Sequence, residues 1–453
     1  MPESFKNDER HQPRDSLSHA TLLDASEPGF LRGDPITGDR YYCSEFAKQE
    51  QEQMWARIWH IGGREADLRA PGDWIVHNFL RESVIIARQT DGAIRAFYNS
   101  CRHRGNRLLW AEEGTGDFKC TYHGWTYGVD GVLKQAQDPE DFEGGSPCGR
   151  VSLVGLKCDT WGGFVWYTMH PDAPPLMEFL DPIPLLMKNR DLEDSVRVVH
   201  RTFNVDANWK FASDNFNESY HLPTVHPELA TTTDEDYKNT TFEAYSSGHN
   251  RMIEQAQPSL RAPNPNEVEA PWDAILKEWE LDPSTFAGRA RESRIPLQQQ
   301  RRKLGPQRGF AHYEKLTDDE LTDYFHHTLF PNVTLTGTAE GVHFFRTEPH
   351  PTDPEKCTFD YWFLAPPVKD MDSIGTICGQ KPMREAQHEF ISYGAGADIP
   401  DMQGSFLLQD LGIAVGQQLG FHSRGYSDAI LSGQESRVRR FHEVLNDYIS
   451  TRR

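Results

Sequence analysis

Two short clusters of cysteine and histidine constrain this chain more than any other feature of its sequence. Cys101 and His103 form Cys-x-His, and after sixteen further residues Cys120 and His123 form Cys-x-x-His. Thiolate and imidazole ligands suit both zinc and iron–sulfur centres. Structural zinc sites usually draw on Cys pairs, whereas a [2Fe–2S] centre with two Cys on one iron and two His on the other accepts one ligand of each kind from each loop. The spacing favours the iron–sulfur centre and leaves a zinc site as the alternative.

The stretch from Cys101 to Gly128 resembles the Rieske iron–sulfur motif, with Gly105 and Gly124 where such loops need a tight backbone. The resemblance implies that Cys101 and Cys120 bind one iron and that His103 and His123 bind the other. Short β-rich runs between residues 72 and 168, separated by turn signals at 90–92 and 129–131, predict a small antiparallel domain around the motif. We expect an all-β Rieske domain over residues 45–170.

Composition limits the partners and the compartment. A net charge of −21 argues against nucleic acid or an anionic membrane as a partner, because both require clustered Lys and Arg. Seven scattered cysteines do not resemble a disulfide framework, and no apolar run is long enough to span a bilayer. We therefore expect a cytoplasmic protein, with a partly disordered N-terminal segment at 1–44 that packs on the catalytic domain.

A second metal site is predicted in the sequence DNFNESYHLPTVHP. His221 and His226 are five residues apart with Pro223 between them, so we expect a helix to end near Leu222 and the second imidazole to approach from the following turn. The pattern Glu-x-Tyr-His-x4-His resembles the catalytic domain of Rieske non-haem iron oxygenases, the terminal oxygenase α subunits of the aromatic-ring-hydroxylating dioxygenase family. That resemblance implies a mononuclear Fe(II) held by His221, His226 and one carboxylate.

The third ligand is expected far along the chain. The sequence FLLQDLGIAVGQQLGFHS resembles the closing motif of the family, which places the carboxylate at Asp410. Asp398 and Asp401 are nearby rivals. A carboxylate with two neutral imidazoles leaves positions on the iron open for O2 and substrate.

An acidic residue between the two metal centres is a further expectation. In the family, such a residue links a cluster histidine of one subunit to an iron histidine of the next. Glu218 lies three residues before His221 and is the candidate for this role, with Asp214 as its rival. Because the link joins two chains, the resemblance implies a head-to-tail ring, most simply a homotrimer, possibly with a β subunit.

The fold class expected for the whole chain is α+β. An all-β Rieske [2Fe–2S] domain precedes a helix-grip (START-like) α+β catalytic domain over residues 175–453, which contains a helical insertion at about 250–320. The segment at 44–63 is predicted to be one helix, and residues 435–450 form a final amphipathic helix with Val438, Phe441, Leu445 and Tyr448 on one side.

The resemblance implies a terminal oxygenase that hydroxylates or dihydroxylates an organic substrate, aromatic or polycyclic. Electrons would come from NAD(P)H through a separate flavin reductase, with or without a ferredoxin, since the chain carries no dinucleotide-binding fingerprint. The alternative within the family is a monooxygenase that removes N- or O-alkyl groups from a quaternary amine or aryl ether. The alternative outside it is a non-catalytic electron-transfer or ligand-binding protein.

Two further features leave alternatives open. A group of apolar residues could line a substrate pocket or belong to the ordinary core: Phe216, Phe330, Val333, Phe344 and Phe345. Residues 289–308 carry seven basic side chains against one acidic, which either form a solvated charged face or dock an acidic redox partner.

Overall fold

The structure is a computed structural model, and it describes residues 20–24, 30–392 and 405–450. The chain divides into two compact units. Residues 49–179 form one, which we call the cluster unit, and residues 1–48 with 180–453 form the other, which we call the catalytic unit.

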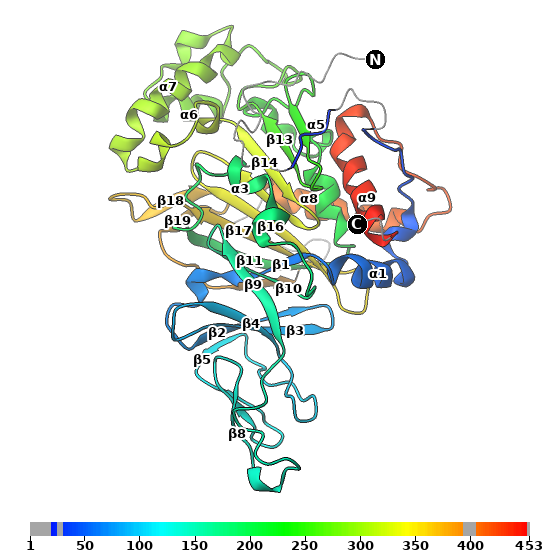
Figure 1. Ribbon diagram of the computed structural model, residues 1–453. Coiled ribbons are helices and arrows are strands. Elements are labelled where there is room, and N and C mark those ends of the chain that lie inside the picture. The colour runs from blue at the N-terminus through cyan, green and yellow to red at the C-terminus, as the bar shows by residue number, and fades with distance from the viewer. Residues whose placement is uncertain (1–19, 25–29, 393–404, 451–453) are drawn as a thin grey trace. The chain divides into compact units, whose positions relative to one another are not determined.

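The cluster unit is built on a seven-stranded antiparallel sheet with the order β1-β10-β9-β4-β3-β2-β5. Its strands are β1 (Trp59–Arg64), β2 (Asp73–Phe79), β3 (Glu82–Arg88), β4 (Ile94–Tyr98), β5 (Glu113–Thr115), β9 (Gly155–Trp161) and β10 (Phe164–Thr168). A separate three-stranded sheet contains β6 (Phe118–Lys119), β7 (Thr126–Tyr127) and β8 (Leu133–Gln135), and Figure 1 shows β8 at one end of this unit. The β-rich pattern of the sequence is confirmed.

The helix predicted over residues 44–63 is only half correct. Helix α1 spans Ser44–Glu50 and continues as a π-helical turn to Trp55, but Trp59–Arg64 form strand β1, which pairs with β10. Two glycines allow this strand to lie close to its neighbours, since a Cβ on Gly62 would stand 2.1 Å from the Ile86 side chain. Pairing with a distant strand has overridden the helical pattern of the local sequence.

The catalytic unit is built on an eight-stranded sheet with the order β12-β13-β14-β15-β16-β17-β11-β20. All pairs are antiparallel except β11 with β20. The strands are β11 (Val196–Val205), β12 (Thr241–Ala244), β13 (Asn250–Glu254), β14 (Tyr324–Leu329), β15 (Val333–Gly337), β16 (Val342–Pro349), β17 (Cys357–Ala365) and β20 (Glu389–Ser392), and a two-stranded hairpin adds β18 (Ser373–Thr376) and β19 (Gly379–Pro382).

Eight further α-helices are present in the described residues. They are α2 (Leu176–Leu180), α3 (Ile183–Leu186), α4 (Lys210–Phe216), α5 (Leu222–Val225), α6 (Trp272–Glu278), α7 (Arg294–Leu304), α8 (Phe406–Phe421) and α9 (Ser436–Ile449), the first ending where the two units meet in sequence. The amphipathic pattern of the last helix is confirmed: Val438, Phe441 and Leu445 are buried, and Tyr448 stacks on Phe330 at 5.4 Å between ring centroids. The α+β class expected for this part of the chain is therefore observed.

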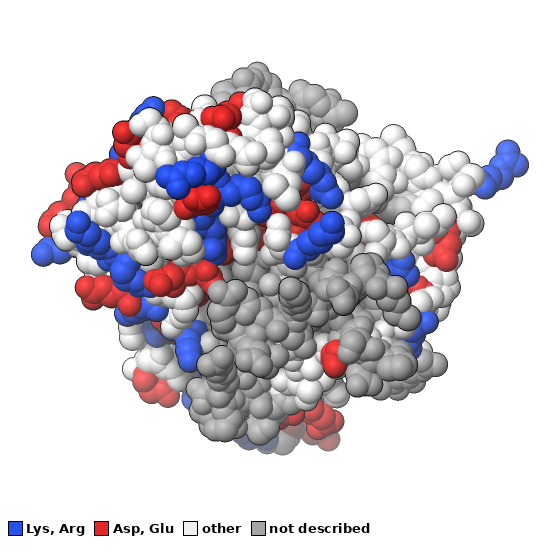
Figure 2. Space-filling model, turned by 90° about the horizontal axis from the view of Figure 1, so that it is seen from above, with Lys and Arg blue, Asp and Glu red and all other residues white. Residues whose placement is uncertain are grey.

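The basic run at 289–308 is partly exposed, as a solvated charged face would be at Arg289 and Lys303, but its arginines are engaged with carboxylates. Six of its arginines are paired with carboxylates of the same unit: Arg289–Glu292, Arg291–Asp234, Arg294–Asp323, Arg301–Glu340, Arg302–Asp318 and Arg308–Glu280. These arginines belong to the lobe of α6 and α7, which lies beside the sheet in Figure 1. On the face shown in Figure 2, basic and acidic side chains are interspersed over the described residues. The run thus ties the helical insertion to the catalytic unit.

The described part of the N-terminal segment belongs to the catalytic unit and contacts its last two helices. The Glu443 carboxylate accepts hydrogen bonds from the backbone of Arg32 and Gly33, and Tyr41 stacks on Phe421 at 4.0 Å. Residues 1–19 and 25–29, on which the expected disorder falls, lie outside the described residues. None of the described helices combines the length and the apolar character needed to cross a bilayer.

Candidate functional site

The backbone around the two predicted iron histidines departs from the expected helix. Helix α4 ends at Phe216, and the chain turns before α5 begins at Leu222. Pro223 lies in the first turn of α5, where its missing N–H costs no hydrogen bond, so it starts a helix and does not end one. The Glu218 carboxylate accepts a hydrogen bond from the backbone N–H of His221 at 3.1 Å and stabilises the turn between them.

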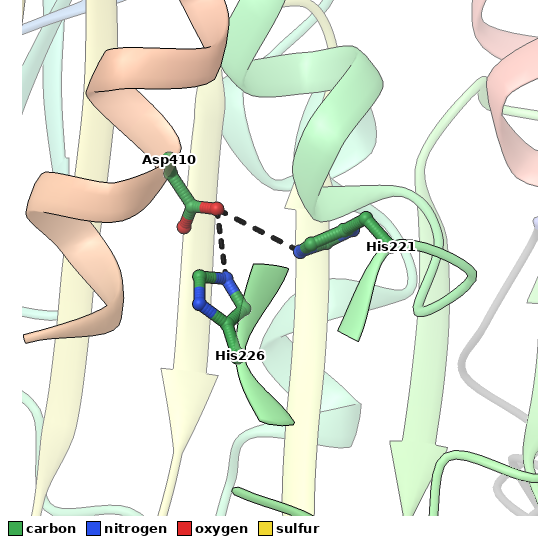
Figure 3. Close-up of side chains that lie close together, drawn as sticks. All are labelled: His221, His226 and Asp410. Carbon is green, nitrogen blue, oxygen red and sulfur yellow. Dashed lines mark hydrogen bonds and ion pairs between the residues drawn. The ribbon is translucent and has the colours of Figure 1, made fainter. Parts of the chain in front are cut away.

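His221, His226 and Asp410 converge on one point, as Figure 3 shows. The Oδ1 atom of Asp410, on α8, lies 2.9 Å from His226 Nε2 and 3.7 Å from His221 Nε2. The potential ligand atoms of the three residues all lie within 4.8 Å of one another. Two imidazole nitrogens and one carboxylate oxygen on one side of a point are the donor set of a facial triad, so these residues fit a mononuclear iron.

The electrostatics of this cluster favour a cation. Burial disfavours the charged imidazole of His221, but the hydrogen bond with Glu218 and the negative charges of Glu218 and Asp410 outweigh it and raise the pKa of His221 above its ordinary value. The carboxylates thus attract positive charge to this position. A bound divalent cation would supply that charge in place of a proton.

In each histidine of the triad, the ring nitrogen Nδ1 lies within hydrogen-bond distance of a side-chain oxygen. Nδ1 of His221 lies 2.7 Å from Glu218 Oε1, and Nδ1 of His226 lies 2.6 Å from Gln409 Oε1. In the neutral tautomer that donates through Nδ1 to these acceptors, Nε2 carries no proton and is available to a metal, which would then take the place of the contact between His226 Nε2 and Asp410. The interaction of Glu218 with His221 agrees with one half of the predicted bridge.

Gln409 was not anticipated from the sequence, because its neighbour Asp410 carries the resemblance and a side chain one position away on a helix normally faces elsewhere. We expect Gln409→Ala to lower the affinity for the mononuclear iron by roughly 10- to 100-fold, as loss of such an acceptor usually does. Iron titration of the variant, with the cluster absorbance as internal reference, measures this. Gln409→Glu, which keeps the acceptor, should retain iron, and equal affinity in the alanine variant would contradict the role.

The rival residues are placed differently. Asp214 accepts a hydrogen bond from Tyr41 Oη at 2.6 Å and pairs with His442 Nε2 at 2.8 Å, so both its oxygens are engaged with residues outside the triad. Asp398 and Asp401 lie outside the described residues.

The predicted cluster residues lie on two loops with the same backbone geometry. The N–H of Gly105 donates to Cys101 O at 2.9 Å, and that of Gly124 donates to Cys120 O at 3.1 Å. Both glycines have positive φ, 75° and 70°, which a side chain would strain. The structure therefore contains tight turns at the two glycines where the resemblance implied them.

The side chains of these loops lie at one end of the cluster unit. The rings of His103 and His123 are 4.6 Å apart between centroids. Nδ1 of His103 is buried and has no hydrogen-bond partner among the described residues, as expected of an atom reserved for a metal. Burial acts to raise the pKa of Cys120, but hydrogen bonds from the backbone of Tyr122 and His123 outweigh it and lower that pKa, which favours the thiolate. The loops fit a [2Fe–2S] cluster.

A cavity of about 320 Å³ opens beside the triad in the catalytic unit, and His221, His226 and Asp410 form part of its wall. Of the apolar residues proposed from the sequence, Phe216 and Phe345 line it. The other three belong to the core: Phe330 stacks on Tyr448, Phe344 stacks on Trp362, and Val333 is buried on β15. Strand alternation explains the division, since Phe344 and Phe345 face opposite sides of the sheet.

Two protein-family models match this chain. The family model described as "Ring hydroxylating alpha subunit (catalytic domain)" matches residues 192–451, more than half of the chain. The chain belongs to this family. A second model, "Rieske [2Fe-2S] domain", matches residues 58–144. The family consists of oxidoreductases that incorporate oxygen, and its cofactors are the Rieske cluster and a mononuclear iron.

Curated relatives of this ring-hydroxylating alpha subunit include two kinds of oxygenase. The carnitine monooxygenase oxygenase subunit of Acinetobacter pittii (strain PHEA-2) is 33% identical over 218 residues, which is 46% of this chain and 56% of the relative. The large oxygenase component of the naphthalene 1,2-dioxygenase system of Pseudomonas putida is 33% identical over 224 residues, 46% of this chain and 47% of the relative. The chain spans about half the length of the curated relatives it matches.

Solved structures with the same fold cover nearly the whole chain. A quaternary ammonium Rieske monooxygenase in complex with an inhibitor has a TM-score of 0.63 at 19% identity, covering 91% of this chain and 95% of its own. Naphthalene 1,2-dioxygenase from Rhodococcus sp. bound to indole has a TM-score of 0.60 at 19% identity, covering 92% and 94%. These likenesses establish the fold.

Proposed function

We propose that this chain is the terminal oxygenase component of a multicomponent Rieske oxygenase. The observation that carries the proposal is the convergence of His221, His226 and Asp410 at the wall of a cavity large enough for a small organic molecule. A ferrous ion held there would supply the activation of O2. The protein itself would hold the three ligands on one side of the ion and the substrate on the other side of the ion.

Electrons for this reaction would enter at the cluster from a separate reductase, directly or through a ferredoxin. Transfer to the catalytic iron then requires a group that contacts the iron site and is accessible from another chain. Glu218 meets both needs, because it holds His221 and also lines a second cavity of about 210 Å³ with Asp214 and Glu435. Glu218 is therefore our candidate for the link to His123 of a neighbouring copy.

The charges and exposed side chains near the cluster loops and at the second cavity support a contact between two copies of the chain. Two aromatic side chains near the cluster loops are exposed, Trp110 at 71% and Tyr122 at 55%. An arginine guanidinium lies over each ring, that of Arg107 over Trp110 and that of Arg104 over Tyr122. The second cavity presents carboxylates. A basic, aromatic surface on one copy and an acidic cavity on another complement each other, and repetition of such a head-to-tail contact closes a ring, most simply a homotrimer.

The proposal is tested by oxygen uptake. Protein reconstituted with iron and sulfide, supplied with NADH and a surrogate Rieske-oxygenase reductase, should consume O2 in response to substrate and place an oxygen atom from 18O2 in the product. A panel of aromatic hydrocarbons, aryl ethers and amines covers the reactions expected from the sequence. Reduction of the cluster without substrate-dependent oxygen uptake across the panel would instead favour a non-catalytic electron carrier.

The second candidate reaction is oxidative removal of an N-alkyl group. Carnitine and glycine betaine monooxygenase subunits are among the relatives. Formaldehyde release from a methylated amine distinguishes this reaction from ring hydroxylation.

A further inference from the structure

The floor of the 320 Å³ cavity contains a row of polar side chains that the sequence did not single out. Glu254 on β13, His326 on β14 and Thr336 on β15 all line this cavity. Nε2 of His326 lies 3.1 Å from Glu254 Oε2, and Nδ1 lies 2.9 Å from Thr336 Oγ1. Because a carboxylate only accepts, His326 donates through Nε2, and Glu254 is fixed in place by the next strand.

Glu254 is buried and incompletely satisfied. Its side chain is only 4% exposed, and its second oxygen, Oε1, has no hydrogen-bond partner among the described residues. Leaving a buried carboxylate oxygen unpaired is costly, so such a group needs a compensating partner.

Arg437 does not supply that partner directly. Its guanidinium donates to Asn250 Oδ1 at 2.7 Å, to Thr328 Oγ1 at 3.1 Å and to the carbonyl oxygen of Phe216 at 3.3 Å, and it makes no ion pair with a described carboxylate. Burial lowers the pKa of Arg437 to about 9 despite the nearby carboxylates. Because its hydrogen bonds go to other groups, the charge of Arg437 acts on Glu254 only at a distance.

The charges on the cavity wall are unbalanced. Glu218, Glu254 and Asp410 line it, and the described lining residues include no lysine and no arginine. A ferrous ion at the triad would offset two negative charges, those of Asp410 and Glu218, which adjoin its ligands. The charge of Glu254 remains, with no lysine or arginine among the described residues that line the cavity.

We propose that Glu254 binds a positively charged group of the substrate, so that the cavity accepts an organic cation with an apolar body and excludes carboxylates. This inference rests on the proposed function and narrows it. Phe216 and Phe345 supply apolar and aromatic wall next to the charge, a combination that suits alkylated ammonium groups. Carnitine and glycine betaine carry a carboxylate as well as a quaternary ammonium, and the described residues of this wall include no lysine or arginine to receive that carboxylate.

The test compares two molecules of the same shape, phenyltrimethylammonium and its uncharged carbon analogue tert-butylbenzene. Equilibrium dialysis of the iron-loaded, cluster-containing protein measures both dissociation constants without requiring turnover. We expect the wild type to bind the cation at least about tenfold more tightly than the analogue, because the cation meets a buried carboxylate whose second oxygen has no hydrogen-bond partner among the described residues. Glu254→Gln should reduce this preference to about twofold or less and leave the affinity for the analogue unchanged.

The matched control is Met252→Leu, on the same strand and the same wall, which changes neither charge nor volume much and should keep the preference. Retained iron in both variants shows that they are folded. An undiminished preference in Glu254→Gln, a wild type that binds the analogue as tightly as the cation, or a wild type that binds neither, would each overturn the proposal. Substrate-dependent oxygen uptake is measured in a separate experiment. Failure of the cation-binding proposal therefore does not count against the oxygenase function, and failure of the oxygenase function does not count against cation binding.

Discussion

Replacing Asp410 with alanine is expected to lower the bound iron from about three atoms per chain to about two, because the cluster alone then retains its metal. Substrate-dependent oxygen uptake should fall by at least about 100-fold, since removal of a direct ligand exceeds the effect of removing a residue behind one. The reduced cluster should keep its EPR spectrum, because its four ligands lie in the other unit of the chain. Metal and labile-sulfide analysis of anaerobically purified protein provides the measurement.

The control for this experiment is Asp273→Ala. Asp273 is also a helical aspartate, but it pairs only with Lys277 on the surface of α6, and its loss should leave iron content and oxygen uptake near wild type. His221→Ala should behave like Asp410→Ala. An Asp410→Ala protein that still holds about three irons would transfer the ligand role to another carboxylate, and Asp398 or Asp401 would then be examined first.

The metal residues were predictable because metal chemistry admits few residue types. Cys and His at close spacing, and two His followed by a distant Asp, restrict the possibilities even when the local backbone is misjudged, as it was between α4 and α5. The resemblance to a family also allowed Asp410 to be predicted as the third ligand, although it is 184 residues from His226. The convergence of these three side chains was thus easier to anticipate than the elements that carry them.

Features that depend on distant pairing were not predictable in the same way. The arginines at 289–308 resemble an open basic patch in the sequence, because their partners Asp234, Asp323 and Glu340 lie far away along the chain. Glu254 looks like any polar residue of a strand until β14 places His326 beside it. Residues 59–64 continue a helical pattern until pairing with β10 makes them a strand.

Glu218→Gln should keep both metal centres and stop electron transfer between them. The amide preserves the size of the side chain but removes its charge and one acceptor, so it no longer holds His221 and a second imidazole at once. We expect reduction of the cluster by the reductase to be unchanged and the subsequent oxidation of the cluster in the presence of O2 and substrate to slow by at least about 100-fold. Stopped-flow absorbance of the cluster measures both steps.

The matched variant is Asp214→Asn, whose wild-type carboxylate is committed to Tyr41 and His442. Loss of these buried hydrogen bonds should lower the free energy of unfolding by about 1–3 kcal/mol and leave the cluster oxidation rate near wild type. If Asp214→Asn blocked cluster oxidation and Glu218→Gln did not, the bridge would belong to Asp214.

Whether the electron crosses between chains is decided by mixing two inactive variants. Cys101→Ser removes the cluster and keeps the catalytic iron, whereas His221→Ala does the opposite, so neither homogeneous protein should turn over. In a ring assembled from equal amounts of both, an intact iron site occurs in half of the chains, and its cluster-donating neighbour is intact in half of those cases. Transfer between chains therefore predicts about one quarter of the wild-type rate per chain. Transfer within a chain predicts no activity in verified mixed rings, because no chain holds both centres, and that result would remove Glu218 from its role between subunits.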